Sequence, residues 1–299
     1  MKTFLLTLKR NVKMFFKDKG LFFTSLITPL ILLLLYATFL SNVYKNSVND
    51  IFSNMGIILD SKILNGIASG QLISSLLAVS CVTVSFCSNM LMVQDKVSGA
   101  RTDMLISPVK PHTLAFSYYF ATFISTLIIS LVATVVGIVY VKITGWYMSF
   151  GDILLVLLDV LMLVTFGTAL SSVINFFLSS QGQISAVGSI VSSCYGFICG
   201  AYMPLSSFSE GLRNVLMFLP GTYGTSLLRN HALRGVLEEL STTCPQEAVN
   251  GLKDAIDCNI YFFDTKIQLP TMYIVMIATI AILIVAYVLM NVFANKKNK

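Results

Sequence analysis

The chain has 299 residues, of which 56% are hydrophobic and only 11% are charged, and its mean hydropathy is +0.80. Soluble domains carry about 25% charged residues. This composition therefore excludes a water-soluble globular enzyme, a disordered chain and a nucleic-acid-binding protein. A net charge of +6 would suit nucleic acid, but the positions of the charges indicate a membrane topology instead.

Residues 1–20 predict an amphipathic helix that lies in the membrane interface. One face of this helix is apolar and holds Phe4, Leu8, Val12 and Phe15. The opposite face is basic and holds Lys2, Lys9, Lys13 and Lys17. Such a separation of faces is typical of interfacial helices. The alternative is an ordinary basic flank with no defined helix.

Charge-free stretches long enough to cross the hydrocarbon core, which takes about 20 residues, recur along the chain. In lipid the backbone must satisfy its own hydrogen bonds, so these stretches predict helices. They also lack the alternation of barrel strands. The sequence therefore predicts an all-α polytopic membrane protein, a single transmembrane domain over 1–299, with six transmembrane helices at 21–40, 69–92, 115–139, 153–177, 184–203 and 271–293.

Basic residues predict the orientation of these spans. Twelve of the 20 Lys and Arg residues lie in three flanks that fall on one side of a six-span chain: the N-terminus, the loop after the second span and the C-terminus. We expect that side to be the cytoplasm of a bacterial cell, with the protein in the plasma membrane. The segment 204–269 is then extracellular.

Sequence patterns of catalysis are absent. There is no phosphate-binding P-loop, and the chain has only two histidines, far apart, so a two-histidine metal helix is excluded. The cysteine spacings do not form a zinc site. We therefore expect no catalytic residue, no metal site and no cofactor bound by this chain.

The segment 94–110, between the second and third spans, predicts a short helix that ends at a proline. It reads Gln-Asp-Lys-Val-Ser-Gly-Ala-Arg-Thr-Asp-Met-Leu-Ile-Ser-Pro-Val-Lys. This segment resembles the cytoplasmic coupling segment of ATP-binding-cassette (ABC) exporter permeases of the type-2 drug and polysaccharide exporter family. The matching residues are Asp95, Lys96, Gly99, Met104, Leu105, Ser107, Pro108 and Val109, whereas Ala100 and Arg101 depart from the family's Thr-Leu. The alternative is a plain cytoplasmic loop.

A second segment, 200–223, carries the same resemblance. It begins with Gly200, continues through Pro204-Leu205 into an apolar helical face, and reaches Pro220 and Tyr223, with Arg229 following. The family ends its fifth span in this way, with a short helix that dips into the outer leaflet before the sixth span. The two segments occur at the expected places among the six predicted spans.

The resemblance implies a permease subunit of an ABC exporter, which is not itself an enzyme. Two ABC ATPase subunits and a second, identical permease subunit would be its partners, besides membrane lipid, and the ATPase subunits would hold ATP and Mg. The ATPase-coupling candidates are Asp95, Lys96, Gly99, Arg101, Ser107 and Pro108. Asp95 and Lys96 are expected to face the ATPase, where complementary charge fixes register.

The same resemblance places the second and fifth spans along the substrate pathway. The candidate pathway residues are Thr83, Phe86, Asn89, Met90, Tyr195, Phe197 and Tyr202. Their alternative is contact with lipid. The small residues Gly188, Ser192, Gly196 and Gly200 follow at four-residue steps in the fifth span. They would let a helix approach closely, either in the second subunit or in the same chain.

Two further features leave alternatives open. Asp159 is the one ionisable residue deep in a predicted span, and it could act in a proton relay or pair with a base such as Lys142 or Arg213. Cys244 and Cys258 lie outside the spans, and they could form a disulfide or remain free thiols.

We expect the protein to export amphipathic or hydrophobic compounds such as a drug, an antibiotic, a peptide or a lipid-like product. A polysaccharide or glycolipid exporter is the alternative. An ion-gradient-driven secondary carrier would need inverted repeats or several intramembrane charges, which the sequence does not display. An assembly or immunity factor without transport is a third class.

Overall fold

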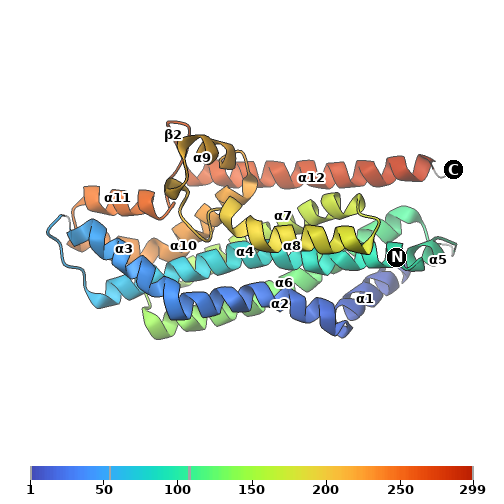
Figure 1. Ribbon diagram of the computed structural model, residues 1–299, viewed down its shortest axis with the longest axis horizontal. Coiled ribbons are helices and arrows are strands. Elements are labelled where there is room, and N and C mark those ends of the chain that lie inside the picture. Colours follow the sequence, from blue (N-terminus) through green and yellow to red (C-terminus); the bar gives the residue numbers. More distant parts are fainter. Residues whose placement is uncertain (1, 54, 107–108, 298–299) are drawn as a thin grey trace.

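The computed structural model describes residues 2–53, 55–106 and 109–297, and nearly all of its elements are helices. Figure 1 shows an elongated bundle whose long helices run along one axis. The N-terminus, the C-terminus and the short helix α5 lie at one end of this bundle, and α3 and α11 lie at the other. We call these the terminal end and the distal end.

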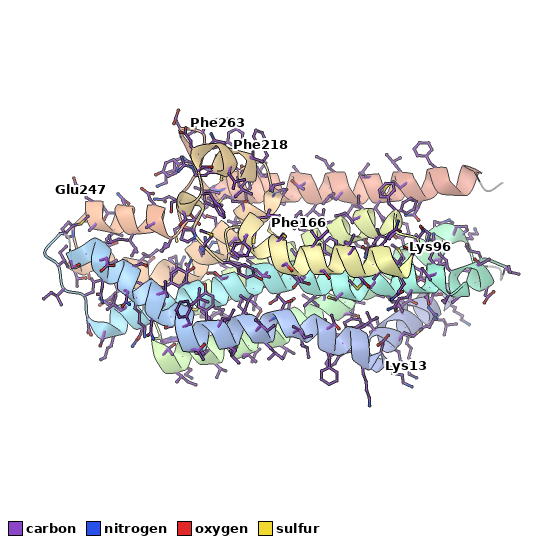
Figure 2. The ribbon with its side chains drawn as sticks, viewed as in Figure 1. Lys13, Lys96, Phe166, Phe218, Glu247 and Phe263 are labelled. Atoms are coloured by element: carbon purple, nitrogen blue, oxygen red, sulfur yellow. The ribbon has the colours of Figure 1, made fainter. Side chains whose placement is uncertain are left out.

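A helix with one face buried lies where the sequence predicts the amphipathic element, and its position in the membrane interface stays a prediction. Helix α1 (Lys2–Lys17) buries Thr7, Asn11 and Phe15 and leaves its lysines exposed, and it packs on α6. Figure 2 shows Lys13 pointing away from the bundle. Asp18 then accepts a hydrogen bond from the backbone N–H of Leu21 at 3.1 Å, which caps α2 (Lys19–Leu35).

The first apolar helix extends beyond the predicted span. Helix α2 continues through a π-helical turn, η1 (Tyr36–Leu40), into α3 (Ser41–Ser53). Helix α4 (Ser61–Val97) follows, begins at the cap Asp60 and has 37 residues. Such a helix is about 55 Å long at 1.5 Å per residue, so it reaches past a hydrocarbon core at both ends.

Helix α4 is the central element of the bundle. Helices α2, α6, α7, α8 and α10 all pack against it. In the most apolar 18-residue stretch of α4, 94% of the residues are buried. Serine, threonine, glycine and alanine recur along α4, and these small side chains let neighbouring backbones approach from several sides. The core of the molecule therefore surrounds α4 rather than lying on one of its faces.

The outer helices begin at recognisable caps. Helix α6 (Pro111–Thr144) has proline in its first turn, and α7 (Phe150–Phe176) begins with a capping box formed by Ser149 and Asp152. Ser180 and Gln183 form the same arrangement before α8 (Gln181–Ile198). The Ser-Ser-Gln-Gly-Gln sequence that separates the predicted fourth and fifth spans is thus the N-terminus of a helix.

The segment after α8 forms a compact assembly near the distal end. It contains η2 (Leu205–Ser207), α9 (Glu210–Leu216), α10 (Pro220–Thr243) and α11 (Gln246–Ala255). A small antiparallel hairpin, β1 (Ile260–Phe262) and β2 (Thr265–Ile267), pairs Ile260 with Ile267. Phe263 in the turn of this hairpin contacts Phe218, which follows α9, with ring centroids 6.5 Å apart, and Figure 2 labels both. Helix α12 (Leu269–Lys297) then returns along the bundle to the terminal end.

Five helical stretches in the described part of the chain are long and apolar enough to cross a membrane: Lys19–Ser53, Ser61–Val97, Pro111–Thr144, Phe150–Phe176 and Leu269–Phe293. They correspond to predicted spans one to four and six. The predicted fifth span, 184–203, falls on α8, which has only 18 residues, begins with Gln181-Gly182-Gln183 and is not among the five. The membrane crossing predicted at 184–203 therefore stays a prediction.

Candidate functional site

An ion pair with a buried carboxylate connects three helices at the terminal end. Asp95 lies in the last turn of α4 and is 4% exposed. Arg10 of α1 donates two hydrogen bonds to its carboxylate, from Nη1 to Oδ2 at 2.6 Å and from Nη2 to Oδ1 at 3.1 Å. The hydroxyl of Tyr118 in α6 donates to Oδ2 at 2.5 Å. Asp95 therefore joins α1 and α6 to the end of the central helix.

The geometry of this cluster is that of a strong charge-assisted interaction. A guanidinium that contacts both oxygens of a carboxylate has a fixed orientation as well as a favourable energy. The hydrogen bond with Asp95 raises the pKa of Arg10, although partial burial acts in the opposite direction. Arg10 Nη1 also donates to Asn11 at 2.8 Å, and Asn11 donates to Ser117 of α6 at 3.5 Å. Helix α1 is thus held by polar contacts as well as by its apolar face.

Lys96, the next residue, holds the end of α7. Its Nζ donates to the carbonyl oxygens of Leu178 at 2.9 Å and Phe176 at 3.3 Å. These carbonyls lie where α7 ends and have no partner within the helix, and a cation is favourable there. Figure 2 shows Lys96 near the terminal end of α8. Adjacent residues of α4 thus fix α1 and α6 on one side and α7 on the other.

These contacts correct the expected role of Asp95. The sequence placed Asp95 and Lys96 on a surface facing the ATPase, but Asp95 is buried and paired within its own chain, and Lys96 is partly buried. The correction has a simple cause: Arg10 lies 85 residues away in the sequence, so no local pattern reveals the pair. Both residues therefore contact other helices of their own chain in this structure.

The chain turns at Gly99 and forms the predicted short helix, α5 (Ala100–Ile106). Gly99 has a φ of +83°, in the left-handed region that favours glycine. No residue of α5 is buried, and Leu105 and Ile106 are exposed apolar residues, the latter 81% exposed. Arg101 is partly buried. Ser107 and Pro108 lie outside the described residues.

Three of the predicted pathway residues are enclosed by the chain's own helices. Thr83, Phe86 and Asn89 of α4 are all buried. Asn89 donates to Ser171 and Ser172 of α7, each at 3.1 Å. The prediction that these three side chains line an open pathway is therefore wrong for this conformation, because other helices surround α4 on every side.

Two of the predicted pathway residues do line a cavity. Phe197 of α8 and Tyr202 just beyond it contact each other edge to face, with ring centroids 5.0 Å apart. They lie along a groove of about 460 Å³ between α2 and α8. Apolar side chains of α2 and η1 supply the other wall: Ile27, Ile31, Leu32, Leu35, Tyr36 and Leu40. Met90 of α4 instead packs against Gly188 of α8, and Tyr195 of α8 packs against Gly221 of α10.

The small residues of α8 mostly face the same chain. A Cβ atom at Gly188 would lie 2.4 Å from Met90 Cε, and one at Gly196 would lie 2.3 Å from the ring of Tyr202. Gly200 has a φ of +73° and ends α8 beside Leu205. For these three glycines the structure therefore favours packing within the same chain. Ser192 lines the groove between α2 and α8.

A different face of α8 is exposed. Its residues recur at four-residue steps and are mostly small: Ser185, Ala186, Ser189, Ile190, Ser193 and Cys194. We call these residues the open face of α8. These residues follow the same four-residue spacing of small side chains that pointed to the glycines. The sequence alone does not show which of the two rows is covered by α4.

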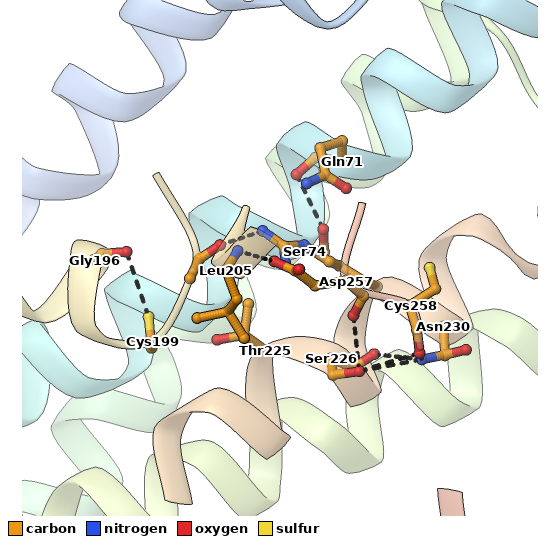
Figure 3. A network of polar contacts seen from close by, with 12 residues as sticks. Gln71, Ser74, Gly196, Cys199, Leu205, Thr225, Ser226, Asn230, Asp257 and Cys258 are labelled. Carbon is orange, nitrogen blue, oxygen red and sulfur yellow. Dashed lines mark hydrogen bonds and ion pairs between the residues drawn. The ribbon is translucent and has the colours of Figure 1, made fainter. Parts of the chain in front are cut away.

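A second buried network lies toward the distal end, where the other parts of the assembly that follows α8 contact α10. Arg229 of α10 pairs with Asp257 at 2.9 Å and donates to the carbonyl of Gly200. The same carboxylate accepts from the backbone N–H of Leu205 at 2.8 Å, as Figure 3 shows. Burial raises the pKa of Asp257, and the charge of Arg229 acts against this. Arg229 thus ties the end of α8, η2 and the loop before β1 to α10.

The structure gives Asp159 other partners than the sequence suggested, and it shows no bond between Cys244 and Cys258. Asp159 pairs with His231 at 2.6 Å and accepts from Tyr273 at 2.9 Å, rather than pairing with Lys142 or Arg213. Cys244 and Cys258 are both free cysteines, and Cys258 is buried. Within the described residues no group of three His, Cys, Asp or Glu side chains could hold a metal ion.

Comparisons with known proteins support the resemblance carried by the two segments. A search of curated proteins found no match, and a search of solved structures found none either. A family model described as "ABC-2 type transporter" matches residues 2–232. This match begins with α1, includes the whole cluster around Asp95 and ends within α10. The chain therefore belongs to the ABC-2 type transporter family, as a permease with several apolar helices in the membrane.

Proposed function

We propose that this chain is the membrane-spanning subunit of an ATP-driven exporter, and that a separate ATPase subunit docks at its terminal end. The observation that carries the proposal is the position of α5. None of the residues of this helix is buried. It begins four residues after Lys96, and Asp95 and Lys96 are the residues of α4 that hold α1, α6 and α7. A force applied to α5 would therefore reach four helices through Asp95 and Lys96.

The proposed orientation puts the terminal end in the cytoplasm, where ATP is available. The exposed lysines of α1 agree with this orientation, because basic flanks favour the cytoplasmic side. The distal assembly, including the predicted segment 204–269, would then lie on the outer side. We expect a multi-pass protein of the bacterial plasma membrane with both termini inside the cell.

The groove between α2 and α8 supports an amphipathic or hydrophobic substrate. Its walls are mainly aliphatic and aromatic, with Ser192 and Ser193 as the polar contributors from α8. Pockets of this kind bind ligands mostly through apolar contact, with a few polar groups that fix orientation. A drug, antibiotic, peptide or lipid-like product fits such a surface better than a polysaccharide does, because a polysaccharide needs many hydrogen-bonding partners.

A transport assay tests the proposed function. The chain is reconstituted in vesicles with its ATPase subunit, and movement of an amphipathic fluorescent dye is followed after ATP addition. We expect ATP-dependent transport that requires both proteins, and a loss of transport for Tyr202→Ala in the groove. Transport by the permease alone under an ion gradient would instead support a secondary carrier.

A second copy of this chain is the proposed partner for the open face of α8. Helices associate in lipid through small residues that let backbones approach closely, and this face is the exposed small-residue row of α8. Two copies would also bring two α2–α8 grooves together around one pathway, with one ATPase subunit below each copy.

Cys194 provides a test of this interface because it is an exposed cysteine on the open face. An oxidant or a short bis-maleimide should cross-link two permease chains in the intact complex, and Cys194→Ser should abolish the product. Cross-linking that persists in Cys194→Ser, or that joins the chain only to other proteins, would reject the open face as the contact between copies.

A further inference from the structure

A buried triad of titratable side chains connects α10 with two other helices. His231 Nδ1 of α10 lies 2.6 Å from Asp159 Oδ2 of α7, and the hydroxyl of Tyr273 in α12 donates to Asp159 Oδ1 at 2.9 Å. The rings of His231 and Tyr273 are stacked, with centroids 6.2 Å apart. Asp159 is 1% exposed and His231 is 6% exposed. Three helices thus meet at one carboxylate.

The distance between His231 and Asp159 is that of a charge-assisted hydrogen bond. A carboxylate buried in this way needs a positive partner, because an uncompensated buried charge is strongly unfavourable. The imidazole supplies that charge only while it is protonated. In this respect the triad differs from the Arg229–Asp257 pair, whose guanidinium keeps its charge at every physiological pH.

Protons have a route to this imidazole. His231 lines a cavity of about 240 Å³ together with Arg234, Glu238 and Lys253. The side chains of Arg234 and Glu238 are 45% and 72% exposed, so the cavity opens to the surface. Asp159 contacts the ring but does not line this cavity. His231 is therefore placed between the surface and the buried carboxylate.

Several other charged groups lie around α10. Arg234 pairs with Asp152 of α7 at 2.6 Å and lies 3.8 Å from Glu238 on its own helix. Lys253 of α11 faces the cavity. In α4, which packs on another side of α10, the charged residues are Lys62, which is exposed, and Asp95 and Lys96 at the terminal end. Carboxylates, Lys and Arg keep their charge near neutral pH, whereas histidine changes its charge there.

We propose that His231, Asp159 and Tyr273 form a proton-binding site that sets how tightly α10 is held against α7 and α12. With the proton bound, the charged pair holds the three helices together. Without it, the pair becomes a neutral imidazole beside a buried carboxylate, and α10 loosens. This inference depends on the contacts of the triad and not on the direction of transport or on the substrate.

The chain offers two natural probes for this site. It has only two histidines, and the other, His112, is exposed at the start of α6. It has one tryptophan, Trp146, next to Tyr147, whose ring packs on Gly66 of α4 and whose carbonyl packs on Gly235 of α10. Trp146 is 41% exposed. Because its neighbour Tyr147 contacts α10 about one helical turn from His231, we expect the emission of Trp146 to change when α10 moves.

The experiment titrates the full-length protein in nanodiscs between pH 5 and 9. The nitrogen resonances of labelled histidine are recorded in His112→Gln, and Trp146 emission is recorded in the wild type and in each variant. We expect the nitrogen resonances of His231 and the Trp146 emission to change together with pH, with one common midpoint. His231→Gln should abolish the change in emission, and His112→Gln should leave it intact.

Asp159→Asn provides a second variant in case His231→Gln does not fold. It should move both titrations to lower pH, because the protonated imidazole loses the carboxylate that stabilises it. The proposal is overturned if His231 does not titrate between pH 5 and 9. It is also overturned if the Trp146 change persists in His231→Gln, or if Asp159→Asn leaves the midpoint where it was.

Discussion

Asp95 at the end of α4 accepts two hydrogen bonds from Arg10 of α1, a residue 85 positions earlier in the chain. This relationship connects the interfacial helix to the central helix immediately before α5. Movement at the terminal end therefore cannot displace α4 without also displacing α1, unless the pair breaks. The predictions below follow from this cluster and from the second network toward the distal end.

Arg10→Ala should destabilise the terminal end. The variant leaves a nearly buried carboxylate with Tyr118 as its remaining side-chain partner, and losing hydrogen bonds to a charged group costs about 1.5–3 kcal/mol. Thermal unfolding in nanodiscs measures the effect, with Lys9→Ala on the exposed face of α1 as the control. A double variant, Arg10→Ala with Asp95→Asn, should lose less than the sum of the single variants. Strictly additive losses would show that the pair is not coupled.

Lys96→Met should loosen the junction between α7 and α8. The substitution preserves the length of the side chain but removes the donor to the carbonyls of Phe176 and Leu178. Hydrogen exchange should become faster in peptides that contain residues 177–183 and should be unchanged in α12. Unchanged exchange at the junction would mean that these two hydrogen bonds do not hold it.

Gly99→Ala should strain the turn before α5. A Cβ atom there meets nothing within 4 Å, so the cost comes from the positive φ alone and is about 1–2 kcal/mol. Asparagine tolerates this conformation better, so Gly99→Asn should retain more ATP-driven transport than Gly99→Ala. Gly251→Ala is the control, because it lies in α11 with open space around it and no positive φ. Equal transport in all three variants would contradict a strained turn.

Arg229→Leu should destabilise the distal assembly strongly. It leaves Asp257 buried without its charge partner, and breaking a buried pair in this way costs about 3–5 kcal/mol. Arg229→Leu with Asp257→Leu should recover part of the loss, because no unpaired charge remains. The free energy of unfolding of both variants is the measurement, and a double variant less stable than Arg229→Leu alone would contradict this account.

Much of the fold follows from hydropathy because lipid demands long apolar helices. The predicted centres of spans one to four and six all fall within long helices of the structure. The predicted ends of the helices differ from those in the structure. The first helix continues through α3, which contains polar residues such as Lys45 and Asp50, and a search for apolar runs stops before these residues. For α8 the glutamines at its start shorten the apolar run, so length alone does not settle its crossing.

The contacts of the candidate site could not be predicted in the same way. Asp159 and His231 are 72 residues apart, and their pairing depends on how α7 and α10 pack. The burial of Thr83, Phe86 and Asn89 depends on the central place of α4, which the family resemblance alone does not show. The sequence did contain one signal for this arrangement. Small residues recur along α4, and a helix with small side chains on several sides can be packed by neighbouring helices on all of them.

Contact between α5 and the ATPase tests the central claim most directly. A photoreactive amino acid is placed at Ile106, 81% exposed in α5, and as a control at Phe263, 56% exposed beside the distal hairpin. Irradiation of the intact complex should cross-link position 106 to the ATPase subunit and position 263 to no ATPase. Cross-linking of the ATPase at position 263 but not at position 106 would contradict docking at the terminal end.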